Sequence, residues 1–161
     1  MSEPMSLLRT SPPPAQAVEL EQWSLSSGTD LRPLRLALRA ALSAHRLVGP
    51  AEPDEVPDRV ILVATELASN ALRHGSPPAV VRLLRGAGEF VVDVADHDLA
   101  GAPRLARVHQ AGAGGRGLHI ARTLTHDLCW YVTERTKHIW ASFPLPPGGA
   151  SRQPGTEPAS R

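Results

Sequence analysis

The sequence predicts an α+β fold: a two-layer α/β sandwich in which about three helices cover one face of a mixed, mostly antiparallel sheet. Three observations predict it. Five short runs rich in β-branched and aromatic residues have the length and alternation of strands. Three longer stretches repeat apolar residues with helical spacing. Finally, two of the runs are joined by a short glycine turn, which is typical of a hairpin and therefore of an antiparallel sheet.

The chain has 161 residues, which is enough for one domain with a hydrophobic core and too few for two of ordinary size. Apolar residues make up 42% and charged residues 20%, close to the averages of globular proteins. Pro, Ser and Gly concentrate at both ends, where too little apolar surface offsets the entropy of ordering the chain. We therefore expect disordered tails over 1–16 and 146–161, and one folded domain over 17–145.

The net charge and the cysteine content indicate which partners and which cellular compartment to expect. A formal net charge of +1 provides no strong field for a phosphate backbone or an anionic lipid surface, so we expect neither nucleic acid nor membrane as a partner. The single cysteine, Cys129, cannot form an internal disulfide, which suits a reducing compartment. No apolar run approaches the ~20 residues that span a bilayer. A cytoplasmic location is expected.

The first part of the domain predicts a strand and two helices. Residues 17–25 alternate apolar and polar side chains as a half-buried strand does, and Asp30 in the following turn is a possible helix cap. Residues 31–48 carry a leucine-rich stripe that predicts a helix, and "GPAEP" ends it. The next helix opens near residues 54–58, where acidic residues and a proline suit a first turn, and closes at Gly75.

The second part predicts the rest of the sheet and one more helix. Residues 79–86 and 89–96 are short β-rich runs separated by a glycine turn, which predicts a hairpin. Residues 118–128 follow a glycine cluster and have helical spacing. Two further strand-like runs, 129–134 and 138–143, extend the hairpin into a larger sheet.

The stretch "ATELASNALRHG", residues 64–75, places three polar side chains in one file beside the apolar stripe of the second helix: Glu66, Asn70 and His74. A carboxylate and an amide four residues apart share one helix face, so both could point at one object between this helix and a neighbouring layer. A solvated helix edge is the alternative interpretation. His74 near a helix C-terminus is also typical of a residue that compensates the helix dipole.

Asp96 is a carboxylate on an apolar face. Alternation in "EFVVDVADHD" assigns Phe90, Val92 and Val94 to one side of a strand and puts Asp96 on the same side. Burying an ionised group costs several kcal/mol unless a partner compensates, so either the strand ends before Asp96 or Asp96 binds something. A carboxylate there could accept a hydrogen bond from the exocyclic amine of adenine, whereas guanine presents an acceptor to it.

A glycine cluster follows, with glycines at 112, 114, 115 and 117. Glycines allow close backbone approach to a ligand, and the helix after them presents unpaired N–H groups, for which phosphate is the natural occupant. The spacing also satisfies the G-x-G-x-x-G dinucleotide fingerprint, but no clear strand leads into it and no room follows for a Rossmann half. A flexible loop without a ligand is the remaining alternative.

Taken together, a helix with E-x-x-x-N, a hairpin strand ending in Asp and a glycine loop that opens a helix resemble the GHKL (Bergerat-fold) ATP-binding domains. Within them, "ATELASNALRHG" and "GGRGLHIARTL" resemble the single-domain anti-sigma-factor serine/threonine kinases. The resemblance covers nearly the whole folded region. It implies ATP and Mg²⁺ as cofactors, and an enzyme that is a serine/threonine protein kinase.

The resemblance also implies a role for each residue. Glu66 would be the general base that orients the attacking seryl hydroxyl, Asn70 would hold Mg²⁺ through its side-chain oxygen, and Asp96 would read the adenine amine. His74 would face the phosphates. The lid over the triphosphate would be formed by Gly114, Gly115, Arg116 and Gly117.

By the same resemblance, the chain would bind a sigma factor, phosphorylate an anti-sigma-factor antagonist and form homodimers. The sequence departs from the family pattern at two glycine positions, which hold Asp98 and Ala100, and at a threonine position, which holds His138 with Thr136 two residues earlier. The alternative is therefore a degenerate interaction module without productive ATP turnover. A sensor histidine kinase fragment is disfavoured, because no helical phosphoacceptor segment precedes the domain.

Overall fold

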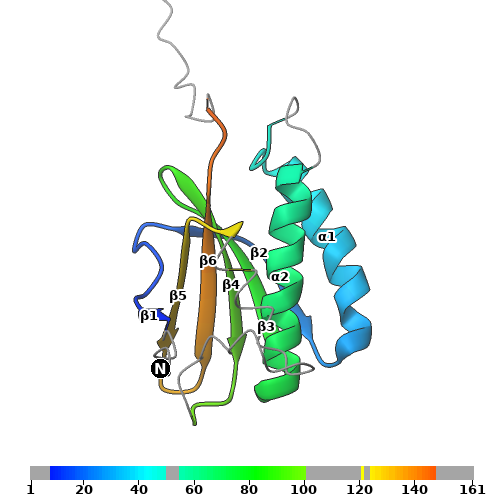
Figure 1. Cartoon of the computed structure of the whole chain (residues 1–161), viewed down its shortest axis with the longest axis vertical. Coiled ribbons are helices and arrows are strands. Elements are labelled where there is room, and N and C mark those ends of the chain that lie inside the picture. The colour runs from blue at the N-terminus through cyan, green and yellow to red at the C-terminus, as the bar shows by residue number, and fades with distance from the viewer. Residues whose placement is uncertain (1–7, 50–54, 101–120, 122–123, 148–161) are drawn as a thin grey trace, which may run out of the picture.

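The computed structural model describes residues 8–49, 55–100, 121 and 124–147. Within them a six-stranded sheet has the order β1-β5-β6-β4-β3-β2, and helices α1 and α2 pack side by side on one of its faces (Figure 1). β1 pairs with β5 in parallel and every other neighbouring pair is antiparallel. The predicted α+β sandwich with a mixed, mostly antiparallel sheet is confirmed.

The described elements follow the order that the sequence predicts, with one short strand added at the start. They are β1 (Arg9–Thr10), β2 (Val18–Leu25), a 3-10 turn (Gly28–Asp30), α1 (Leu31–Ala44), α2 (Glu55–His74), β3 (Ala79–Arg85), β4 (Glu89–Asp96), β5 (Asp127–Val132) and β6 (Lys137–Pro144). Neither described helix is long and apolar enough to cross a membrane.

The third expected helix, over 118–128, falls largely outside the described residues. Ala121 and Leu124 are helical, and Ala121 is buried in the main core. β5 begins at Asp127, so the last two residues of the expected helix belong to a strand instead.

Alternation along the strands gives the sheet two different faces. Phe90, Val92 and Val94 of β4 point toward the helices and join the main core, where the ring of Phe90 stacks on that of Phe143 at 5.3 Å. Each fully buried side chain of this size contributes about 1.5–3 kcal/mol. The opposite face, which we call the outer face, carries a smaller apolar cluster that includes Val91 and Trp140.

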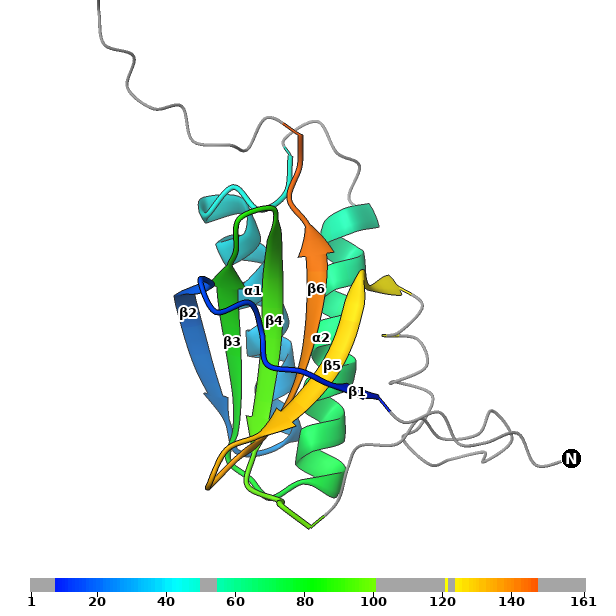
Figure 2. The same cartoon turned by 90° about the vertical axis from the view of Figure 1, so that its left-hand side faces the viewer.

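The expected disordered tail over 1–16 is wrong for its described part, residues 8–16. Figure 2 shows this segment crossing in front of the outer face of the sheet. Arg9 and Thr10 form β1 against β5, Leu8 is buried, and the indole Nε1–H of Trp140 donates to the carbonyl of Ser11 at 2.7 Å. Backbone pairing and tryptophan contacts with a distant strand order this proline-rich segment, and composition does not report either of them.

Asp30 caps a turn, although not the one expected. Its Oδ2 accepts hydrogen bonds from the backbone N–H groups of Ser26 and Ser27, and these bonds lower the pKa of the Asp30 carboxyl. It makes no side-chain cap bond to α1, which begins at Leu31. Asp30 therefore fixes the 3-10 turn that leads from β2 into α1.

Candidate functional site

Asp96 lies at the end of β4, on the face of the sheet that the helices cover. β4 runs through Asp96, which pairs in register with Lys137 of β6, and Asp96 is only 3% exposed. The alternative in which the strand ends before this residue is therefore wrong. Asp96 thus lies on the apolar side of β4, as the alternation of the strand predicts.

Two neighbours compensate the charge of Asp96. Its Oδ1 accepts a hydrogen bond of 2.8 Å from the backbone N–H of Asp98, and its Oδ2 lies 3.7 Å from Nζ of Lys137. The same Nζ lies 4.0 Å from Oδ2 of Asp98. Because Lys137 is itself only 8% exposed, the two buried charges depend on each other.

The C-terminal end of α2 presses directly against the Asp96 carboxylate. A Cβ atom added to Gly75 would lie 2.4 Å from Cγ of Asp96 and 2.5 Å from its Oδ2. The backbone N–H of His97 also donates to the carbonyl of Ser76 at 3.1 Å, which ties the residue after β4 to the residue after Gly75. A glycine at this position lets the helix end and the acid approach each other closely.

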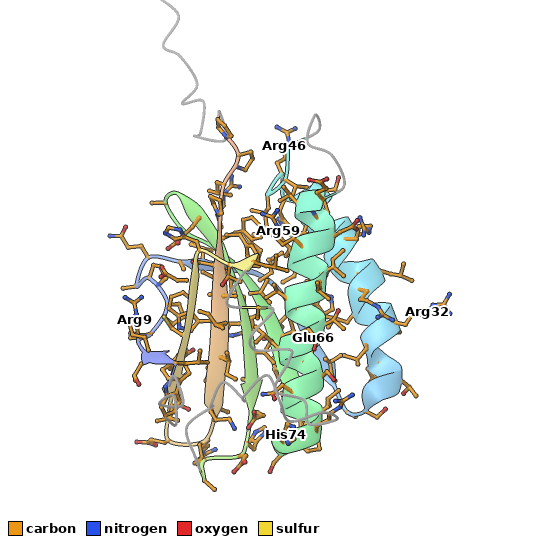
Figure 3. The ribbon with its side chains drawn as sticks, viewed as in Figure 1. Arg9, Arg32, Arg46, Arg59, Glu66 and His74 are labelled. Atoms are coloured by element: carbon orange, nitrogen blue, oxygen red, sulfur yellow. The ribbon has the colours of Figure 1, made fainter. Side chains whose placement is uncertain are left out.

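The polar file of α2 runs toward this contact. Figure 3 shows Glu66 near the middle of α2 and His74 near its C-terminal end, and Asn70 lies between them in the sequence. With a rise of about 1.5 Å per residue, successive members are about 6 Å apart along the axis. Burial of Ala64, Leu67 and Ala71 fixes the rotation of the helix, so that Glu66 and Asn70 are half-buried and His74 is exposed.

The structure thus places Asp96 at the end of α2 that carries His74. Asn70 lies about one helical turn from His74, and Glu66 about two turns, toward the N-terminal end of α2. Within the described residues, the side chains of these three members of the file make no hydrogen bond. The predicted lid residues Gly114, Gly115, Arg116 and Gly117 lie outside the described residues.

Lys137 is the residue that sequence reasoning missed. The signal was present, because Ile139, Ala141 and Phe143 face the core and the same count of two puts Lys137 beside them. His138, noted for its departure from the family pattern, points to the outer face and bonds to Asp93 at 3.0 Å. It therefore does not line the surroundings of Asp96, whereas Lys137 and Asp98 do.

A sequence model of the histidine kinase-like ATPase domain matches residues 26–143. The chain belongs to this family. A search of curated proteins found no match. Among solved structures, the chain is similar to the Acinetobacter baumannii histidine kinase AdeS, with 13% identity and a TM-score of 0.42 over 80% of this chain and 69% of that one.

The family is one of ATPase domains, so an adenine nucleotide is the expected ligand of this histidine kinase-like ATPase domain. Asp96 supplies a buried acceptor with lone pairs beyond its two compensating contacts, and Gly75 brings the end of α2 beside it without a side chain. No group of three or more His, Cys, Asp or Glu among the described residues could hold a metal ion. The Asn70 oxygen is the ligand that the resemblance implies for Mg²⁺, and phosphate oxygens usually complete the coordination of this ion.

Proposed function

We propose that this histidine kinase-like ATPase domain is a Mg-ATP-binding regulatory protein that binds a sigma factor and phosphorylates an anti-sigma-factor antagonist on serine, and so regulates transcription. The observation that carries the proposal is the buried Asp96 against the end of a helix whose polar file holds Glu66, Asn70 and His74. The resemblance of "ATELASNALRHG" to anti-sigma-factor kinases supplies the partner class.

Each side chain has a task that its chemistry allows. The Asp96 carboxylate would accept a hydrogen bond from the adenine amine, and the Asn70 side-chain oxygen would hold Mg²⁺. Glu66 takes the proton of the attacking seryl hydroxyl, a role that typically contributes about 10² to 10⁴-fold. By the resemblance, His74 would face the phosphates and residues 114–117 would form the lid over them. When bound, Mg-ATP supplies the phosphoryl group, and its metal neutralises charge on that group.

The regulatory part of the proposal is a partner switch in a cytoplasmic homodimer. ATP changes which partner is bound only if the two partners prefer different nucleotide states of the protein, because a ligand shifts an equilibrium through differential affinity alone. The switch therefore requires that the affinity for the sigma factor differs between Mg-ATP and Mg-ADP.

Two variants test the assignment. Asp96→Asn should abolish stabilisation of the fold by nucleotide in a thermal shift assay, because the amide presents a donor toward the adenine amine. Glu66→Ala should bind Mg-ATP as the wild type does but lose transfer of labelled phosphate to a seryl residue of the antagonist. Retained transfer by the Glu66 variant refutes the base assignment.

A second candidate function is an interaction module that keeps the fold without productive ATP turnover. The pairing of Lys137 with both Asp96 and Asp98 favours it, since a cation already occupies one side of the adenine-reading carboxylate. Calorimetric titration with Mg-ATP separates the two candidates. Saturable heat indicates the nucleotide-dependent regulator, and no heat at millimolar nucleotide indicates the module.

A further inference from the structure

The outer face of the sheet carries a hydrogen-bonded relay that the nucleotide site does not use. Oγ1 of Thr136 lies 2.7 Å from Nε2 of His138, and Nδ1 of the same ring lies 3.0 Å from Oδ1 and 3.1 Å from Oδ2 of Asp93. Asp93 is fully buried and His138 is 7% exposed, whereas Thr136 is only partly buried at the β5–β6 turn. A hydroxyl, an imidazole and a carboxylate in this order are the parts of an activated nucleophile.

The partners of the relay fix the direction in which its protons point. The Arg82 guanidinium pairs with Oδ2 of Asp93, and a carboxylate can only accept from Nδ1–H of His138. A neutral ring then has its lone pair on Nε2, aimed at the Thr136 hydroxyl. On the far side, Oγ1 of Thr133 lies 2.6 Å from Oγ1 of Thr136 and accepts from the backbone N–H of Thr136 at 3.1 Å.

The groups around His138 hold the ring without competing for its proton. The Tyr131 ring of β5 stacks on it with centroids 4.4 Å apart and 14° between planes. Burial raises the pKa of Tyr131 to about 12, and the negative charge of Asp93 raises it in the same direction by a smaller amount. The phenol therefore stays protonated near neutral pH. Arg82 of β3 faces the ring across Asp93, and Glu19 of β2 lies 3.5 Å from that guanidinium.

We propose that Thr136 is an activated hydroxyl that accepts a phosphoryl group from an activated phosphate donor, with His138 as the proton acceptor and Asp93 as a positioning residue. Oγ1 attacks phosphorus and forms an O–P bond, while the bond from phosphorus to the leaving group breaks and the leaving group departs with the electron pair. The hydroxyl proton passes to Nε2 of His138. With a nucleoside triphosphate as donor, the leaving group is the nucleoside diphosphate.

Two features favour a site that accepts and keeps a phosphoryl group over one that hydrolyses a substrate. Thr136 sits at an exposed turn, where a donor protein can reach it, and the imidazolium formed in the step stays between the Asp93 carboxylate and the new phosphate. Asp96 lies on the opposite face of the sheet, so the donor belongs to another molecule, either a second copy of this chain or a separate kinase.

The test uses an alkyl fluorophosphonate, which reacts with activated hydroxyls and needs no nucleotide site. Peptide mass spectrometry should find the phosphonyl group on Thr136 and not on Thr29, whose hydroxyl bonds only to that of Ser27 among the described residues. Thr136→Ser should keep the label and Thr136→Val should lose it. His138→Gln should slow labelling by about 10² to 10⁴-fold.

Two results would overturn the proposal, and neither depends on nucleotide binding at Asp96. These are the absence of label on Thr136, and a labelling rate that folded His138→Gln leaves unchanged. The donor is then identified with labelled Mg-ATP. Phosphothreonine at 136 in the purified protein indicates a second copy, its appearance only with cell extract indicates a separate kinase, and its absence in both refutes phosphoryl acceptance.

Discussion

Replacing Lys137 by methionine tests the buried ion pair beside the candidate nucleotide site. At an effective dielectric constant of about 20, charges 3.7 Å apart attract by about 4.5 kcal/mol. Both side chains are more than nine-tenths buried, so solvent screens the pair little. Removing one partner of a buried pair usually costs about 3–5 kcal/mol, because the other charge is left uncompensated. We therefore expect Lys137→Met to lower the free energy of unfolding by about 3–5 kcal/mol.

Urea denaturation followed by circular dichroism measures this change as a lower midpoint at an unchanged slope. The matched control is Lys137→Met combined with Asp96→Asn. In this double variant neither buried charge remains without its partner, so much of the lost stability should return. A single variant that loses less than about 1 kcal/mol, or a double variant that loses the sum of the two single losses, would refute the argument that the pair is interdependent.

Gly75→Ala places a methyl group 2.4 Å from Cγ of Asp96, so it should cost about 1–3 kcal/mol in urea denaturation and weaken Mg-ATP binding; unchanged stability and binding would contradict the close approach. Glu66→Ala should lower the rate of phosphate transfer by about 10² to 10⁴-fold with unchanged Mg-ATP affinity, and a rate within threefold of the wild type would rule out a base. Tyr131 is the only tyrosine in the chain, so ultraviolet titration of the folded protein should give a midpoint near pH 12. Because this pKa is raised above the unfolded value of about 10, its contribution to stability is present below pH 10 and is lost as pH rises toward 12; a midpoint near 10 in folded protein would show that the phenol is not held by burial.

Most of the layered fold could be predicted, because its signals are local. The stripe of Leu34, Leu38 and Leu42 and the alternation of Phe90 and Val92 each report one buried face, and the structure buries those faces. Strand ends shifted by a residue or two, as at Asp127, because hydrogen bonding to a neighbouring strand sets them.

The features that the sequence did not predict depend on contacts between segments that are far apart in the chain. The N-terminal segment is ordered by pairing of Arg9 with Cys129 and by the bond from Trp140 to Ser11, over more than a hundred residues of sequence. At the site, alternation placed Asp96 correctly but could not name Lys137 as its partner, since the register between β4 and β6 joins them. Residues far apart in sequence meet only once the sheet is assembled.

On the outer face, the burial of Asp93 could not be predicted from the sequence either. The sequence presents it as an ordinary alternate residue of a strand, and its burial follows from Arg82, Tyr131 and His138, which three other strands contribute. Each of these side chains is unremarkable alone. The relay to Thr136 is visible only in three dimensions.

The central claim is that Asp96 and the polar file of α2 form one site for Mg-ATP. Isothermal titration calorimetry of the full chain with Mg-ATP, in parallel with Asp96→Asn, tests it most directly, and circular dichroism establishes that both proteins are folded. We expect saturable binding of one nucleotide per chain by the wild type and none by the variant. Equal binding by both proteins, or no heat from the folded wild type at millimolar Mg-ATP, would contradict it.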